Sequence, residues 1–262
     1  MANGNPKVGI FGLTGCAGDQ LQILNCEDEL VRLAQRLDIV DWVMAKSDND
    51  HGCRLDIAFV EGVVATERDL ETLKEVRARA RLLVAIGTCA VFGGLPAMKN
   101  SVPREVLQRE VNEEGVDLDS VEALPPTHFV PFDLLLPGCP IERSEFLRAV
   151  NALLAGTSPE LPRVPVCWEC KARENVCRVV HFHEVCCGAM TRSGCGARCP
   201  SYGVACAGCR GPIEEPNYDA NITMFAGRGI SWVEIARKMS AFSAPVWMKQ
   251  GLEQEVGRDD AQ

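Results

Sequence analysis

Residues 7–20 read KVGIFGLTGCAGDQ, an apolar run that ends in a glycine-rich turn. The run Lys7–Leu13 has the Val, Ile and Phe content of a buried strand, and an amphipathic stretch follows the turn at once. A buried strand that leads through a short turn into a helix is the first step of a βαβ unit. This stretch therefore predicts a parallel sheet covered by helices on both faces.

The same alternation of apolar runs and amphipathic stretches continues to residue 156. Further strands are predicted at Ile39–Ala45, Asp56–Val64, Leu82–Ile86 and Phe132–Leu136. Helices are predicted at Gln20–Leu37, Thr66–Ala80, Arg104–Glu114 and Ile141–Leu154. Thr66 and Asp69 form a capping box at the start of the second of these helices. The fold class is therefore α/β, with a flavodoxin-like doubly wound parallel sheet over residues 1–156.

A second domain is predicted over residues 157–262. Residues 157–166, TSPELPRVPV, contain three prolines, which cannot continue a helix and are typical of a linker. Residues 167–216 have little periodicity and few large apolar side chains, so we expect a small irregular domain held together by bound metal. One C-terminal helix is predicted at Ser231–Ala241, with Trp232, Ile235 and Met239 facing inward.

Composition excludes several classes of function. The chain has 262 residues, 47% of them hydrophobic, and a formal net charge of −9, which argues against binding to nucleic acid phosphates. No run approaches the roughly 18 consecutive apolar residues of a membrane helix. The first twenty residues lack the features of a secretory signal, so we expect a cytoplasmic protein without a transmembrane segment.

The cysteine content is unusual, since 14 cysteines are present and nine of them lie between Cys167 and Cys209. Cysteines in such numbers form either a disulfide framework or thiolate ligands to metal. Disulfides seldom persist in the cytosol, and a chain of this length does not need them for stability. Metal binding is therefore the favoured interpretation.

Three of the remaining cysteines each follow a predicted strand. Cys16, Cys89 and Cys139 lie in glycine-containing loops, and loops after parallel strands meet at one edge of the sheet. GLTGCAG matches neither dinucleotide nor P-loop motifs, which disfavours a nucleotide. Asp19, three residues after Cys16, stands where a fourth ligand would lie, and spacing alone leaves it equally well a helix N-cap.

Two C-x-x-C units and one C-x-x-x-C in the second domain are a strong metal signal. Zinc and iron–sulfur clusters both accept four thiolates, but clusters in series also explain the cysteines at the sheet edge. The motif cysteines and their neighbours are Cys167, Cys170, Cys177, Cys186, Cys187, Cys195, Cys199, Cys206 and Cys209. Cys26 and Cys53 belong to no motif, and each is either a buried apolar residue or a surface thiol.

Five stretches of the sequence resemble the small, electron-transferring subunit of nickel–iron hydrogenases. They are LTGCAGDQ, VEGVV at Val60–Val64, GTCAVFGG, LPGCP, and the block from CWEC to CAGCRGPIEEPN. The viologen-reducing and sulfhydrogenase members of this family resemble the chain but carry a cysteine at the position of Asp19. An aspartate there is similar to the gamma subunit of the hydrogenase that reduces the deazaflavin coenzyme F-420 in methanogenesis.

The resemblance implies three 4Fe–4S clusters. The proximal cluster would be held by Cys16, Asp19, Cys89 and Cys139, and the medial cluster by Cys195, Cys199, Cys206 and Cys209. The distal cluster would be held by Cys167, Cys170, Cys177 and Cys186, with Cys187 as the alternative to Cys186. The division between medial and distal ligands rests on sequence order alone.

The resemblance also implies a function in electron transfer. A large (alpha) subunit would split hydrogen at a nickel–iron centre, and this chain would pass the electrons to an iron–sulfur flavoprotein (beta) subunit, whose FAD reduces F-420. Glu61 would lie in a proton path, or else would be a surface or salt-bridged carboxylate. The alternatives are the small subunit of a hydrogenase that does not reduce F-420, or of a sulfhydrogenase, and a zinc-stabilised adaptor protein.

Overall fold

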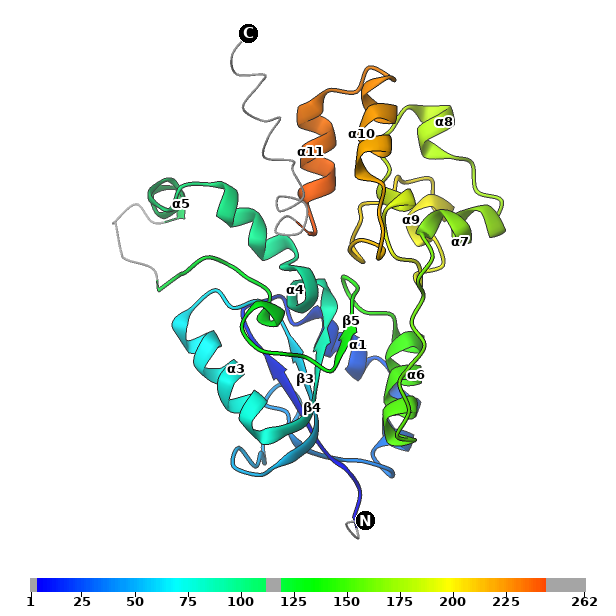
Figure 1. The fold of residues 1–262 in the computed structure, drawn as a ribbon. Coiled ribbons are helices and arrows are strands. Elements are labelled where there is room, and N and C mark those ends of the chain that lie inside the picture. The colour runs from blue at the N-terminus through cyan, green and yellow to red at the C-terminus, as the bar shows by residue number, and fades with distance from the viewer. Residues whose placement is uncertain (1–3, 112–118, 244–262) are drawn as a thin grey trace. The chain divides into compact units, whose positions relative to one another are not determined.

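The fold was analysed in a computed structural model that describes residues 4–111 and 119–243. The chain divides into two compact units, Met1–Pro159 and Glu160–Gln262. Figure 1 shows the strands gathered in the first unit and only helices and loops in the second. Each unit is described separately below.

The first unit contains a five-stranded sheet in which every neighbouring pair of strands is parallel. The strand order is β2-β1-β3-β4-β5, which is the flavodoxin-like order and confirms the predicted fold class. The strands are β1 Lys7–Gly12, β2 Asp38–Asp41, β3 Leu55–Glu61, β4 Ala80–Ile86 and β5 Leu134–Leu136. β2 is shorter than predicted, because the chain leaves the sheet after Asp41.

Helices connect the strands. They are α1 Gly18–Leu24, α2 Glu27–Leu33, α3 Glu67–Arg79, α4 Gly87–Phe92, α5 Arg104–Val111 and α6 Arg143–Leu154, with 3-10 turns η1 Leu95–Ser101 and η2 Pro126–His128. α3 lies on one side of the sheet, and α1 and α6 lie on the other (Figure 1). The predicted capping box is confirmed, since Thr66 Oγ1 accepts from the Asp69 N–H and the Asp69 carboxylate accepts from the Thr66 N–H. The predicted end of α5 lies partly outside the described residues.

The single helix predicted at Gln20–Leu37 is wrong, because two short helices occupy this stretch. Glu27 has a φ of 42°, in the left-handed region that an α-helix of L-residues does not use. The bend turns Ile23 and Cys26 into the core, while Leu21 remains 47% exposed. Cys26 is therefore a buried apolar residue and not a surface thiol.

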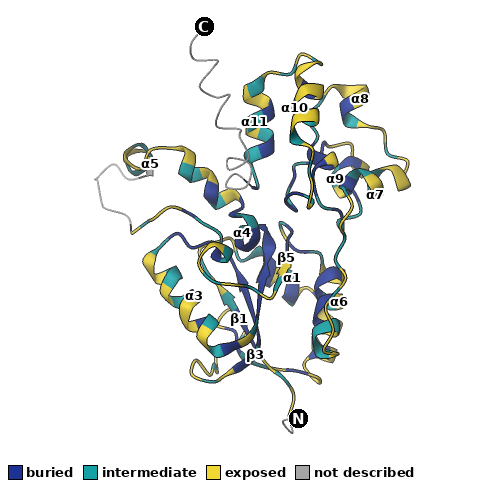
Figure 2. Ribbon diagram, in the orientation of Figure 1, coloured by how far each residue is buried: buried dark blue, intermediate teal, exposed yellow. Residues whose placement is uncertain are grey.

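The core of the first unit lies against the central strands. Figure 2 shows β3 and the helix faces that cover it as buried. Six of the seven β3 side chains are buried. Leu73 and Val76 from α3 pack against one face of the strand. On the opposite face the ring of Phe59 lies 5.4 Å from that of Phe146 in α6. This burial on both faces explains the nearly continuous apolar sequence of β3.

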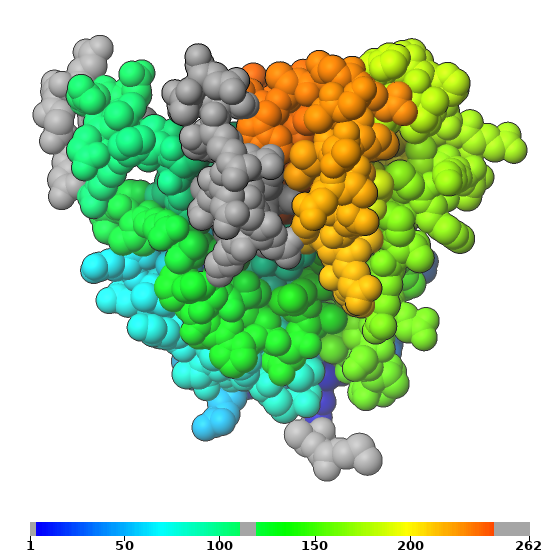
Figure 3. Space-filling view, turned by 45° about the horizontal axis from the view of Figure 1, so that its top comes forward, coloured from blue at the N-terminus to red at the C-terminus, as the bar shows by residue number. Residues whose placement is uncertain are grey.

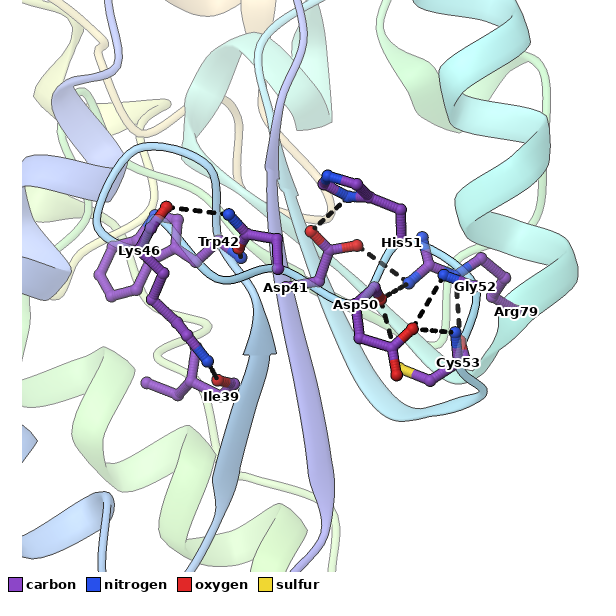
Figure 4. A network of polar contacts seen from close by, with 10 residues as sticks. Ile39, Asp41, Trp42, Lys46, Asp50, His51, Gly52, Cys53 and Arg79 are labelled. Carbon is purple, nitrogen blue, oxygen red and sulfur yellow. Dashed lines mark hydrogen bonds and ion pairs between the residues drawn. The ribbon is translucent and has the colours of Figure 1, made fainter.

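A buried ion pair fastens the loop between β2 and β3 (Figure 4). Arg79 Nη2 donates to Asp41 Oδ2 at 2.9 Å and to the Asp50 carbonyl at 3.0 Å, and Arg79 Nε donates to the Cys53 carbonyl at 3.0 Å. His51 Nδ1 lies 3.0 Å from the other oxygen of Asp41, whose side chain is 1% exposed. Cys53 thus contributes its carbonyl to this loop, and its half-buried thiol lies 3.4 Å from the Asp50 carbonyl.

We expect Arg79→Met to lower the free energy of unfolding by about 3 kcal/mol, because it removes the arginine that pairs with the buried Asp41 carboxylate. The measurement is urea unfolding under anaerobic conditions, followed by circular dichroism. Arg81→Met is the matched control, since Arg81 is 67% exposed and lies 3.5 Å from Asp56. Equal stability of the two variants would contradict the structural role of Arg79.

The second unit contains short helices and no strand within residues 160–243. The helices are α7 Val166–Ala172, α8 Arg178–Phe182, α9 Arg198–Ser201, α10 Tyr218–Ala226 and α11 Trp232–Ser240, with one 3-10 turn, η3 Cys187–Ala189. α11 matches the predicted C-terminal helix, and Ile235 and Met239 are buried as expected. α10 was not predicted.

A small apolar core is nevertheless present in the second unit. Phe225 from α10 is fully buried with Ile235 and Met239 from α11. Cys187 and Met190 complete this core from the cysteine-rich segment. Residues of α10 and α11 lie in the part of the surface drawn in orange in Figure 3. The few apolar side chains of the cysteine-rich segment therefore pack against the two C-terminal helices.

None of the helices in residues 4–111 and 119–243 combines the length and the apolar character that crossing a membrane requires.

Candidate metal centres

Three cysteines lie at the carboxyl edge of the sheet. Cys16 follows β1, Cys89 lies in α4 directly after β4, and Cys139 follows β5. Burial raises the pKa of the Cys89 thiol to about 12, with further contributions in the same direction from the other two cysteines and from Asp19. The four residues of the predicted proximal site therefore lie close enough together for their charges to interact.

Asp19 does not cap a helix, so that alternative is wrong. α1 has Ala17 at its N-cap, and Asp19 Oδ1 instead accepts the backbone N–H of Ile141 at 2.8 Å. Asp19 is 7% exposed, and burial raises the pKa of its carboxyl to about 7 against the opposing effect of the Ile141 hydrogen bond. This carboxylate joins the first turn of α1 to the loop after β5.

Two glycines leave room for the proposed ligands. Gly87 has a φ of +83°, and a Cβ there would lie 1.8 Å from Asp19 Oδ2. A Cβ on Gly94 would lie 2.6 Å from Cys89 Sγ. Backbone thus approaches both ligand atoms at positions where any other residue would collide with them.

Asp69 fixes the loop that leads to Cys16. Besides capping α3, its carboxylate accepts the N–H of Thr14 at 3.1 Å and the hydroxyl of Thr14 at 2.8 Å. A turn two residues before the predicted ligand is therefore tied to the start of α3. The capping box was readable from the sequence, but this second role of Asp69 was not, because Thr14 is 55 residues away.

Glu61 ends β3 and is 2% exposed, which excludes a surface carboxylate. Its Oε2 accepts the backbone N–H of Gln20 at 2.9 Å, and its Oε1 accepts Gln20 Nε2 at 3.2 Å. Trp42 Nε1 in turn donates to Gln20 Oε1 at 2.8 Å. Burial raises the pKa of Glu61 despite the two Gln20 hydrogen bonds. Gln20 was missed by the sequence analysis, and its place directly after Asp19 was the one available signal.

Four cysteines of the second unit form one group. Cys167 and Cys170 lie in α7, Cys177 is the N-cap of α8, and Cys186 precedes η3. Burial raises the pKa of the Cys167 thiol to about 11, with Cys186, Cys170 and Cys177 adding to the rise. These are the four residues that the resemblance assigns to the distal cluster.

The adjacent cysteines 186 and 187 occupy different surroundings. The sulfur of Cys186 accepts the backbone N–H of Cys206 at 3.2 Å. Burial raises the pKa of the Cys186 thiol, and the charges of Cys177 and Cys170 add to the rise. Cys187 is fully buried in the apolar core beside Met190, and burial raises the pKa of its thiol to about 12. Cys186 therefore lies near Cys170 and Cys177, whereas Cys187 is the more deeply buried of the two and belongs to the apolar core.

The last four cysteines lie around α9 and the loop after it. Burial raises the pKa of Cys206 well above its usual value, and the nearby Cys186, Cys187 and Cys209 add to the rise. Burial also raises the pKa of the Cys195 thiol, while hydrogen bonds from the backbone N–H groups of Arg198 and Ala197 lower it. Cys199 lies in α9 itself.

Crowded thiols of this kind, most of them half-buried, fit iron–sulfur clusters. Several thiolates in one place repel one another in a region of low dielectric, and bound iron relieves that repulsion with its positive charge. N–H groups directed at sulfur, such as that of Cys206 toward Cys186, are a known means of tuning clusters. In the described part of the chain no three His, Cys, Asp or Glu side chains are grouped as ligands of one metal ion. The ligands of a four-iron cluster lie further apart, because each of them binds a different iron.

Comparison with known proteins gives three kinds of match. Residues 16–153 match the family model described as NADH ubiquinone oxidoreductase, 20 Kd subunit. The delta subunit of sulfhydrogenase 2 from Pyrococcus furiosus is 35% identical over 90% of this chain and 99% of its own length. A subunit of the F420-non-reducing hydrogenase vhu from Methanocaldococcus jannaschii is 32% identical over 89% of this chain and 92% of its own length.

The solved structure of an NAD⁺-reducing nickel–iron hydrogenase in the H2-reduced state is also similar, with a TM-score of 0.55 and 29% identity. It covers 60% of this chain and 96% of that one. The match to the gamma chain of coenzyme F420 hydrogenase from Methanosarcina barkeri is weaker, at 24% identity over 51% of this chain and 48% of its own length. Similarity is thus greater to subunits of hydrogenases that do not reduce F-420.

Proposed function

The chain belongs to the NADH ubiquinone oxidoreductase 20 kDa subunit family, and we propose that it is the electron-transferring small subunit of a cytoplasmic nickel–iron hydrogenase. The observation that carries this proposal is the group of Cys16, Asp19, Cys89 and Cys139 at one sheet edge. A thiol-rich site at the ligand edge of a flavodoxin-like sheet needs a cofactor that accepts thiolates, and relatives along nearly the whole chain are hydrogenase subunits.

Three 4Fe–4S clusters would be held by this chain, and they supply one-electron transfer when bound. The residues of the chain bind the clusters, exclude water and set the charge around them. Asp19 contributes an oxygen donor at the proximal site, where the carboxylate is already oriented by the Ile141 N–H. Buried Glu61, held by Gln20, would hold or pass a proton beside this site. Hydrogen would be split on a large partner subunit.

We infer that the electron acceptor is not F-420. The full-length relatives named above support an acceptor of the sulfhydrogenase or viologen-reducing type. Reduction of F-420 through an FAD-containing flavoprotein subunit is the second candidate, and it rests on Asp19 and on the partial match to a gamma chain. The two differ in which partner subunit receives electrons from the distal cluster.

The proposal is tested by metal analysis of the full chain in its native complex, purified without oxygen. We expect a brown protein with about 12 iron atoms in this chain, which corresponds to three four-iron clusters. A colourless protein with about two zinc ions would instead identify a zinc-stabilised adaptor. For the acceptor, we expect hydrogen-dependent reduction of viologen without bleaching of F-420, and bleaching at a comparable rate would favour the second candidate.

A further inference from the structure

Arg210 is a buried charge beside the proposed medial ligands. It follows Cys209 directly in the sequence and is only 1% exposed, although arginine rarely lies so deep in a protein. Its Nε donates to the carbonyl of Ser193 at 2.8 Å. The side chain therefore extends from one pair of proposed ligands to the segment that precedes Cys195.

The backbone at this point is shaped to admit the guanidinium. Gly194 has a φ of +118°, and a Cβ there would lie 2.6 Å from Arg210 Nη2 and 3.0 Å from its Cζ. Only glycine leaves this space open. The guanidinium thus lies against the residue next to Cys195, at a place where the chain permits no other side chain.

A carboxylate binds the same loop. Glu169 Oε1 accepts the N–H of Gly194 at 2.9 Å, and Oε2 accepts the N–H of Ala197 at 3.1 Å. Glu169 and Arg210 thus contact the segment around Cys195 from two sides with charges of opposite sign. Arg210 is the more deeply buried of the two, so its field is less screened by solvent.

We propose that Arg210 is a positioning and tuning residue that raises the reduction potential of the medial cluster, through a fixed positive charge buried next to Cys195. The inference rests on the proposed function, because it needs a cluster on Cys195, Cys199, Cys206 and Cys209. Adding an electron to a cluster makes it more negative, and a buried cation at short range stabilises that reduced form. An arginine suits this task because it stays charged at every physiological pH.

The test is a redox titration of the anaerobically purified complex, followed by electron paramagnetic resonance. We expect Arg210→Gln to shift the medial redox equilibrium about tenfold toward the oxidised form, which is about 59 mV for a one-electron couple. Arg210→Lys keeps the charge and should restore most of the wild-type potential. Arg163→Gln is the control, since the Arg163 side chain is 80% exposed and its charge is screened.

Glu169→Gln separates an effect of charge from a general loosening of the loop. Removing this negative charge should move the medial potential upward, opposite to Arg210→Gln. A shift in the same direction for both variants, or an unchanged potential in Arg210→Gln with full iron content, overturns the tuning role. A wild-type complex without iron in this chain would instead overturn the proposed function. Iron content therefore distinguishes the two failures.

Discussion

Asp19→Ala is expected to lower the iron content of the chain from about 12 to about 8 atoms and to slow hydrogen-driven electron transfer more than about 100-fold. Removing a ligand costs more than removing its supporting groups, for which losses of about 10–100-fold are typical. Electrons would then lack the first cluster of the chain. Iron analysis and hydrogen-dependent dye reduction measure both effects. Asp28→Ala is the control, since Asp28 is an exposed carboxylate in the first turn of α2.

Two further substitutions separate ligand binding by Asp19 from its structural role. Asp19→Asn retains an oxygen that can accept the Ile141 N–H, but the neutral amide is a poor iron ligand. We expect it to lose the cluster as Asp19→Ala does. Asp19→Cys should keep about 12 iron atoms and change the proximal potential, because thiolate is a softer donor than carboxylate. Full iron and a normal rate in Asp19→Asn would show that the hydrogen bond is the whole role of this residue.

Cys186→Ala and Cys187→Ala are expected to differ sharply although the residues are neighbours. Cys186→Ala should remove the distal cluster, so that iron falls from about 12 to about 8 atoms and electron exit slows more than about 100-fold. Cys187→Ala should keep all the iron and lower the free energy of unfolding by about 1 kcal/mol, because it opens a small cavity in the apolar core. Iron analysis and urea unfolding of both variants make the comparison.

Each variant serves as the control for the other, since both remove one sulfur atom from the same turn. The opposite result, with iron lost only in Cys187→Ala, would assign the distal cluster to Cys187. The physical basis of the prediction is the extended backbone at Cys186, with φ −125° and ψ 112°. In such a segment successive side chains point to opposite sides.

Much of the fold was predictable because its signals are local. A strand buried on both faces is a continuous apolar run, so β3 and β4 were located within a few residues of their observed ends. The capping box of α3 was readable from Thr66 and Asp69 alone. The helix at Gln20–Leu37 was mispredicted because the chain bends at Glu27, next to the buried Cys26, and the sequence there contains no glycine or proline that would signal the bend.

The candidate ligands of the site were predictable from the sequence, but the polar side chains around them were not. Cysteine spacing and strand-end position indicated which residues could bind metal, and these patterns can be read without coordinates. Gln20 and Arg210 lie in stretches that carry the family resemblance, but their roles became visible only through burial and contacts. Both side chains act on residues far away in the sequence.

By itself, the sequence determined the fold class of the first unit and the chemical nature of its proposed ligands, because hydrophobic periodicity and residue type are properties of short segments. Only the tertiary structure decided that Asp19 meets Ile141, 122 residues away, and does not cap α1. Only the tertiary structure separated Cys186 from Cys187. The reason is that burial and charge depend on distant segments that folding brings together, which no local pattern records.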